Sequence, residues 1–234
     1  MDININNLAV KYNDKTIFNN FNLNIRENKI TCILGASGVG KTTLLNAIAG
    51  TIIYTGNIQK DGDVSFIFQE DRLIPHISVY KNLELVLLSI IIDKKLRQEK
   101  IDEILDIVEL KSVKNNFPTT LSGGMKSRIS MARGFLYPAK ILLMDEAFRG
   151  LDTALKSRLI DAFYKLYNTN KRTIVYVTHS IDEALLLADD VVILKGSPAN
   201  IVYKTTIDQK QENRTLQDER LDKCRKELLK FLLN

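Results

Sequence analysis

A glycine-rich segment has the spacing of a phosphate-binding loop, namely Gly, four residues, Gly, Lys and then Ser or Thr. An apolar, strand-like run (30–34) precedes it, and a helical pattern (41–49) follows it and stops before Gly50. In this setting glycines let backbone N–H groups close around phosphate, and the helix N-terminus adds positive potential. We therefore predict a nucleoside triphosphate site formed by Gly35, Ala36, Ser37, Gly38, Val39, Gly40, Lys41, Thr42 and Thr43. The alternative is a glycine-rich turn that carries an exposed lysine.

Within this loop, Lys41 would reach the β- and γ-phosphates and the Thr42 hydroxyl would hold Mg²⁺. Two carboxylates, Asp145 and Glu146, end another apolar run (141–144). A buried parallel strand delivers such residues to the crevice where α/β folds bind ligands. Asp145 can bind Mg²⁺ directly or through water, and Glu146 can orient and deprotonate an attacking water. Without the phosphate loop, the same pair would be interpreted as solvated acids at an ordinary strand end.

His179 follows a strand-like run (173–178). A histidine in this position is structural when taken alone. Beside a γ-phosphate, a neutral imidazole could hold the water or sense the phosphate, and we favour that role here.

A second anion site is indicated by Leu121-Ser122-Gly123-Gly124-Met125, which opens a helical stretch. A hydroxyl and two glycines at a helix N-terminus suit a bound anion. One nucleotide cannot easily use both loops of one molecule.

Together these motifs resemble the ABC ATPase family, whose signature loop is Leu-Ser-Gly-Gly-Gln. The resemblance covers nearly the whole chain, because the phosphate loop, Gln69, the signature, Asp145-Glu146, Leu151-Asp152 and His179 occur in the family's order. The resemblance implies that two such domains pair head to tail as a homodimer, with each ATP between the phosphate loop of one and the signature of the other. Ser122, Gly123 and Gly124 would then contact the γ-phosphate of the ATP held by the other subunit.

The resemblance implies roles for three further residues. Tyr12 matches the aromatic residue that stacks on adenine, although such a tyrosine more often packs on the core. Gln69 matches the glutamine that touches Mg²⁺ and water and begins the loop that couples to a membrane partner. Asp152 matches the aspartate that crosses the dimer interface.

The chain departs from the family's pattern at three places. Met125 stands where Gln is usual, Ala147 where Pro follows the catalytic Glu, and Arg149-Gly150 where small residues are commoner. None of these changes removes a phosphate ligand or the base. We expect hydrolysis to be retained, with its rate left open.

The strand and helix patterns predict a P-loop NTPase core, an α/β fold with a mostly parallel sheet. Strand-like runs (30–34, 64–68, 141–144, 173–177 and 191–194) alternate with helical patterns. The opening thirty residues predict an antiparallel β layer, and 71–117 predicts a helical subdomain inserted into the core. Ile101, Ile104, Leu105 and Val108 have the spacing of one apolar helix face. We expect a single ABC ATPase domain over 1–234, with an amphipathic C-terminal helix over about 215–234.

The composition limits the classes of function. The chain has 234 residues, of which 45% are hydrophobic, and a formal net charge of +5. The charges are interleaved in sign, which argues against a nucleic-acid partner. No apolar run approaches the roughly 20 residues that cross a bilayer, and the N-terminus lacks a secretion signal. Two distant cysteines form no disulfide framework, so we expect a reducing compartment.

The segment after Gln69, with Asp71-Arg72-Leu73-Ile74-Pro75, is similar to that of bacterial importers for nitrate, sulfonate, taurine and related solutes. The resemblance implies a subunit that hydrolyses ATP at the cytoplasmic face of the cell membrane. Its implied partners are a transmembrane permease and an extracytoplasmic solute-binding protein, and its cofactors are ATP and Mg²⁺. Two alternatives stay open: an ABC ATPase of cytoplasmic assembly, and a nucleotide-switched interaction module.

Overall fold

The larger of two sheets has six strands in the order β5-β6-β7-β3-β8-β9 in the computed structural model, which describes residues 1–233. Its strands are β3 (Ile30–Gly35), β5 (Val64–Ile67), β6 (Ile141–Asp145), β7 (Thr173–Thr178), β8 (Asp190–Lys195) and β9 (Asn200–Thr206). All neighbours pair in parallel except β8 and β9. The prediction of a mostly parallel sheet is confirmed. Strand β5 ends at Ile67, one residue earlier than expected.

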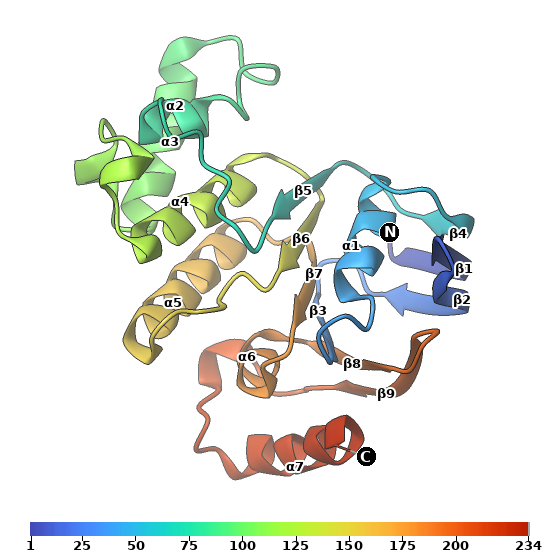
Figure 1. Cartoon of the computed structure of the whole chain (residues 1–234). Coiled ribbons are helices and arrows are strands. Elements are labelled where there is room, and N and C mark those ends of the chain that lie inside the picture. The colour runs from blue at the N-terminus through green and yellow to red at the C-terminus, as the bar shows by residue number, and fades with distance from the viewer. Residues whose placement is uncertain (234) are drawn as a thin grey trace.

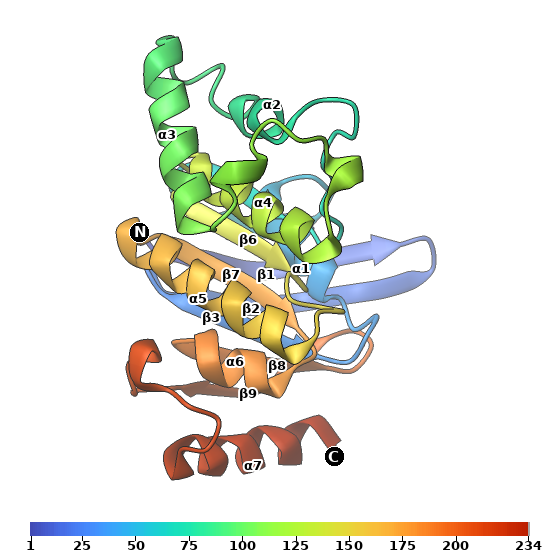
Figure 2. The same cartoon turned by 90° about the vertical axis from the view of Figure 1, so that its left-hand side faces the viewer.

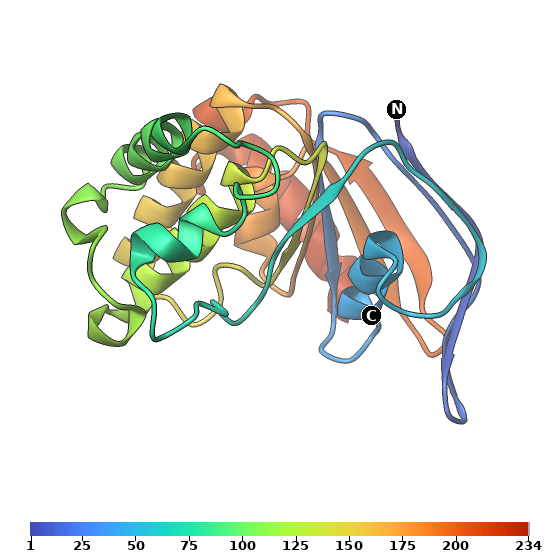
Figure 3. The same ribbon diagram turned by 90° about the horizontal axis from the view of Figure 1, so that it is seen from above.

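A second, antiparallel sheet has the order β2-β1-β4. It consists of β1 (Ile3–Tyr12), β2 (Lys15–Ile25) and β4 (Thr55–Gln59), so the β layer expected from the opening residues is confirmed. Helix α1 (Lys41–Ala49) lies between the two sheets (Figure 3). Its Leu44 and Ile48 are fully buried in one apolar cluster with Phe18 of β2 and Val192 of β8. Burial of these side chains holds the helix that follows the phosphate loop.

Three helices cover the other face of the six-stranded sheet: α4 (Gly123–Leu136), α5 (Thr153–Thr169) and α6 (Ile181–Leu187) (Figure 2). Phe163 of α5 packs edge to face against Phe135 of α4 and against Phe148, which in turn meets Tyr176 of β7. Through Phe148, these aromatic contacts pack the loop after β6 against α5 and β7.

Segment 71–117 contains helices and no strand, as expected. It holds α2 (Val79–Glu84), α3 (Lys94–Ile107) and the short 3₁₀ turn η1 (Lys111–Val113), and a second 3₁₀ turn, η2 (Pro118–Thr120), follows directly after it. The predicted apolar face of α3 is buried, including Ile101 and Leu105. Helix α4 packs against both α2 and α3, so the helical layer continues beyond the expected limit (Figure 2).

The C-terminal helix α7 spans Glu219–Leu233 and lies beneath the six-stranded sheet (Figure 1). The 3₁₀ turn η3 (Gln211–Asn213) precedes it. The helix begins four residues later than predicted, because residues 216 and 217 form a turn and the Asp218 carboxylate accepts from the Arg220 N–H. Leu221 and Leu228 are buried, and Phe231 stacks on Tyr203 of β9. The helix therefore packs on its own domain. The last predicted position, Asn234, lies outside the described residues.

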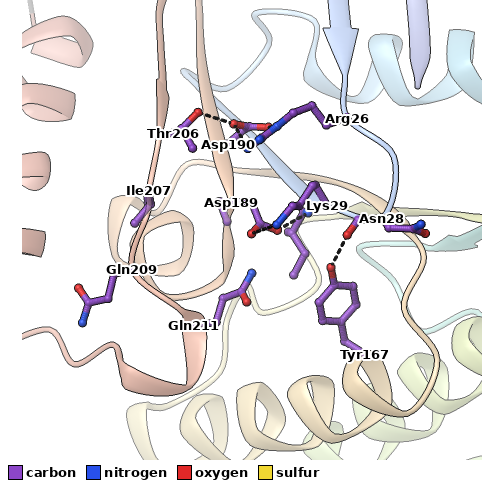
Figure 4. Close-up of polar contacts among 12 residues, drawn as sticks. Arg26, Asn28, Lys29, Tyr167, Asp189, Asp190, Thr206, Ile207, Gln209 and Gln211 are labelled. Atoms are coloured by element: carbon purple, nitrogen blue, oxygen red, sulfur yellow. Dashed lines mark hydrogen bonds and ion pairs between the residues drawn. The ribbon is translucent and has the colours of Figure 1, made fainter. Parts of the chain in front are cut away.

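Polar contacts close the amino-terminal edge of the six-stranded sheet (Figure 4). Arg26, just after β2, makes a bidentate pair with Asp190 of β8 through Nε at 2.7 Å and Nη2 at 2.8 Å. Thr206 of β9 donates to the same carboxylate. This geometry is that of a strong charge-assisted contact, and it fixes the small sheet to the large one at the edge opposite the phosphate loop.

Within residues 1–233, no helix is long and apolar enough to cross a membrane. Cys32 and Cys224 are both free, as expected.

Candidate active site

The phosphate loop connects β3 to α1, as predicted. Gly40 takes the left-handed conformation with φ 116° and forms the N-cap of α1. A Cβ at this position would lie 2.7 Å from Ile17 Cγ2, so only glycine fits between the loop and β2. Lys41 Nζ donates to the Gly35 carbonyl at 2.8 Å and to the Ala36 carbonyl at 3.0 Å. The lysine is thus held inside the loop.

Burial lowers the pKa of Lys41, and the charges of Glu146 and Asp145 oppose that shift. Lys41 is only 5% exposed, and these carboxylates lie at the end of β6, which β7 separates from β3 in the sheet. The two carboxylates favour the charged form of the amine, the form that binds phosphate oxygens.

One cavity of about 590 Å³ brings together the three residues predicted to hold Mg²⁺, namely Thr42, Gln69 and Asp145. They come from α1, from the end of β5 and from β6, and they converge because these elements meet at the carboxyl edge of the sheet. Hydroxyl, amide and carboxylate oxygens are the ligands that Mg²⁺ prefers, and Mg²⁺ commonly takes further oxygens from phosphate and water. The residues present therefore fit the ion.

Burial raises the pKa of Asp145, although a hydrogen bond with Thr42 opposes the shift. The ionised carboxylate therefore costs the folded protein stability above its ordinary pKa of 3.8. We expect Asp145→Asn to raise the midpoint of urea unfolding at pH 7 and to lose this advantage progressively as the pH falls, because protonation of the wild-type carboxyl removes the buried charge. ATP hydrolysis should fall about a hundredfold or more in the same variant. A variant that is less stable than wild type at pH 7 would contradict this account of Asp145.

Glu146 follows β6 directly and has a left-handed backbone with φ 43°. Its N–H donates to the Val177 carbonyl of β7 at 2.9 Å, which fixes this unusual conformation. Non-glycine residues pay for such a conformation in stability, and they are concentrated at functional sites. The side chain is nearly buried, and Oε2 lies 3.4 Å from His179 Nδ1. The structure thus brings together the predicted base and the predicted histidine.

Behind His179 lies a buried carboxylate that our sequence analysis did not single out. Glu183 of α6 is 3% exposed, and its Oε1 accepts from Lys156 Nζ at 2.7 Å. Its Oε2 accepts from the Thr178 hydroxyl at 2.7 Å and from the Tyr176 hydroxyl. Because Thr178 immediately precedes His179, Glu183 joins the histidine loop to α5. Lys156 and Glu183 are distant in sequence, so only the folded chain reveals the pair.

We expect Lys156→Ala to lower the free energy of unfolding by about 2–3 kcal/mol, because it leaves the Glu183 carboxylate buried without its cation. Urea unfolding measures the loss. The matched control is Lys156→Ala combined with Glu183→Gln, which removes the uncompensated charge and should recover part of the stability. Equal stability of the single and double variants would show that the unpaired Glu183 carboxylate costs the folded protein nothing.

The signature residues lie at the start of α4. Ser122 is its N-cap and accepts from the Met125 N–H at 3.3 Å. Gly123 is exposed, with no atom within 4 Å of where a Cβ would be, whereas a Cβ at Gly124 would meet the Leu155 side chain at 2.3 Å. None of the three lines the cavity that holds Thr42 and Asp145. Within one subunit, the two predicted anion sites are thus separate.

The segment after Gln69 is attached to α4 by one arginine. Arg133 of α4 donates to the Asp71 carbonyl at 2.9 Å through Nη2 and to the Arg72 carbonyl at 2.8 Å through Nη1. The Arg72 guanidinium lies 3.8 Å above the Phe68 ring. The segment that follows Gln69 is therefore connected directly to α4, the helix that begins with the signature residues.

Two residues assigned by resemblance have separate structural settings. Tyr12 is half exposed at the end of β1 and pairs with Lys15 across the hairpin. Asp152 is the N-cap of α5 and accepts from the Leu155 N–H at 2.9 Å. Their roles toward adenine and toward a second subunit stay predictions.

The unusual residues near the site differ in their contacts. Met125 and Ala147 are partly buried against the large apolar cluster, which suits apolar side chains at both positions. Arg149 instead donates from Nη1 to Glu146 Oε2 at 2.9 Å.

Comparison with known proteins gives consistent relatives. Residues 18–149 match the ABC transporter family model. The chain is 37% identical over 195 residues to an aliphatic sulfonates import ATP-binding protein of Bacillus subtilis, covering 80% of this chain and 75% of the relative. It is 31% identical over 242 residues to the corresponding Bacillus cereus protein, covering 98% and 95%.

A solved structure shares the fold. It is a dimeric post-hydrolysis state of an ATP-binding cassette bound to ADP and Pi, with a TM-score of 0.77 and 26% identity. The match covers 89% of this chain and all of that chain.

Proposed function

The chain belongs to the ABC transporter family as an ATP-binding, ATP-hydrolysing subunit, and from that premise we propose that it powers import of an aliphatic sulfonate. The observation that carries the hydrolytic part is the cavity lined by Thr42, Gln69 and Asp145, beside a buried Lys41. The names of the relatives supply the class of solute.

In the proposed site, Lys41 and the backbone of residues 35–43 hold the β- and γ-phosphates of ATP. Tyr12 stacks on the adenine. Thr42, Gln69 and Asp145 hold Mg²⁺, which when bound neutralises charge on the transferred phosphoryl group. These roles agree with the burial of Lys41 and Asp145 and with the shared cavity.

Glu146 takes a proton from the attacking water, and His179 orients that water and the γ-phosphate. Both side chains come from the carboxyl ends of adjacent parallel strands, β6 and β7. The Val177 carbonyl fixes the backbone of Glu146, and Glu183 holds the Thr178 hydroxyl next to His179, so the two strand ends that carry the pair are held in place.

We propose a head-to-tail homodimer for the same chemistry. Ser122, Gly123 and Gly124 of one subunit complete the ATP site of the other, and Asp152 lies at the interface. The exposed, open surface at Gly123 supports this arrangement, because nothing in its own subunit fills the space.

The proposed membrane partner is a permease that docks on the helical layer from the cytoplasmic face. Residues 71–117 form this inserted layer in a single ATPase domain over 1–234. Its surface carries exposed apolar side chains on one short segment: Leu85, Leu88, Ile90, Ile92 and Leu96. Exposed apolar clusters of this kind mark interaction sites. An extracytoplasmic solute-binding protein would deliver the sulfonate to the permease.

Two measurements test the proposal. The tagged subunit, isolated from detergent-solubilised native membranes, should carry a multi-spanning permease as a stoichiometric companion identified by mass spectrometry. Cells with the wild-type subunit should accumulate labelled alkanesulfonate, whereas cells with Glu146→Gln should not. If only soluble proteins copurify, an ATPase of cytoplasmic assembly is favoured instead. If sulfonate uptake is the same with Glu146→Gln as with wild type, the role in sulfonate import is rejected.

A further inference from the structure

The loop after β6 contains an ion pair on the catalytic oxygen itself. Arg149 Nη1 donates to Glu146 Oε2 at 2.9 Å, and the Arg149 N–H donates to the Glu146 carbonyl at 3.0 Å. The same Oε2 lies 3.4 Å from His179 Nδ1. Guanidinium and imidazole therefore meet on one carboxylate oxygen.

This pair restricts how the carboxylate can turn toward a water. A base must turn an oxygen to within hydrogen-bond reach of the proton it takes. Both contacts here are made by Oε2, so they restrict the direction in which Oε1 can point. A charge-assisted bond to guanidinium is stronger than a neutral one, and it holds the carboxylate at one rotation. Within the part of the chain that the structure describes, Arg149 is the sole hydrogen-bond donor to this side chain.

The loop also has the means to release the pair. Arg149 is 53% exposed, so water and a neighbouring subunit can reach the guanidinium. Gly150 follows with φ 73° and no atom within 4 Å of where a Cβ would be, whereas Asp152 is fixed as the cap of α5. Gly150 therefore supplies backbone freedom between Arg149 and the fixed start of α5. Arg149 also contributes to the electrostatics of Lys41, so the guanidinium is within electrostatic reach of the phosphate loop.

We infer that Arg149 is a positioning residue that holds the Glu146 carboxylate away from the attacking water in the open subunit, and that the pair must separate for hydrolysis. Closure of the ATP-bound dimer supplies that separation. The inference rests on the proposed role of Glu146 as the base. It predicts a slow basal turnover that is set by opening of this pair.

The test compares kcat for ATP in Arg149→Ala, Arg149→Lys and wild type at saturating Mg-ATP. Arg149→Ala should raise kcat about three- to tenfold, the size expected for losing a partly exposed ion pair, with KM changed less than about twofold. Arg149→Lys should lie between, because an ammonium lacks the planar fork. Added KCl should raise the wild-type kcat and leave the Arg149→Ala value flat, since salt weakens an exposed pair. A damaged fold cannot produce a faster enzyme.

Two controls separate the possible failures. Arg158→Ala removes an exposed arginine of α5 and should leave kcat unchanged. If Glu146→Gln keeps wild-type turnover, the proposed base is wrong. If Glu146→Gln is inactive while Arg149→Ala has an unchanged or lower kcat, the base stands and the inference about Arg149 is overturned.

Discussion

Glu146→Gln should reduce steady-state ATP hydrolysis about a hundred- to ten-thousandfold while ATP binding persists. The amide cannot accept the proton of water, but it has nearly the shape of the carboxylate, so the backbone bond to Val177 and the nearby His179 can remain. The ATP-bound dimer should then accumulate because its hydrolysis is blocked. Phosphate release measures the first effect and light scattering with Mg-ATP the second.

The matched control for this experiment is Glu183→Gln, which also removes a carboxylate near His179 but touches neither water nor phosphate in the proposed site. It should lose stability and retain a larger share of turnover. A Glu146→Gln protein that stays monomeric with Mg-ATP would count against the head-to-tail dimer.

The adjacent signature glycines should respond in opposite ways. Gly123→Asp should cut turnover about a hundredfold or more with little change in unfolding free energy. The new carboxylate has open space in its own subunit, it sits at a helix N-terminus that favours it, and it would face the γ-phosphate of the partner's ATP. Gly124→Ala should instead cost about 1 kcal/mol of stability, because its methyl group must displace the Leu155 side chain.

Turnover and urea unfolding of both variants provide the comparison. The affinity of the Gly123→Asp monomer for ATP, measured with a fluorescent ATP analogue, should equal that of wild type. Full activity in Gly123→Asp would show that this end of α4 does not face a nucleotide.

The local parts of the site could be predicted from the sequence because consecutive residues encode them. The phosphate loop has its glycines, lysine and threonine in one run. Apolar runs mark β3, which leads into this loop, and β6, which ends at Asp145. Strand β9 was missed because its residues alternate between half-buried and exposed and include Asn200 and Lys204. Strand β4 is short and mostly exposed, so it too lacks an apolar signal.

Two side-chain contacts near the site, one local and one between distant residues, could not be predicted from the sequence. Arg149 was noted only as an unusual residue, and its bond to Glu146 depends on the turn at the end of β6. The pair between Lys156 and Glu183 forms because α5 and α6 cover the same face of the sheet. Neither helix pattern indicates which charged side chains will meet.

Arg133 has a thermodynamic consequence for the complete transporter. Its guanidinium binds two carbonyls of the segment that follows Gln69, and it belongs to the helix that begins with the signature. ATP at the signature end of α4 and a permease on the segment after Gln69 would therefore act on the same connected unit. Linkage is reciprocal, so whatever factor ATP applies to the affinity for the permease, the permease must apply to the affinity for ATP. Replacing Arg133 by alanine should weaken the effect of ATP on permease binding and the effect of the permease on ATP binding by the same free energy. This holds even though Arg133 itself need contact neither ligand.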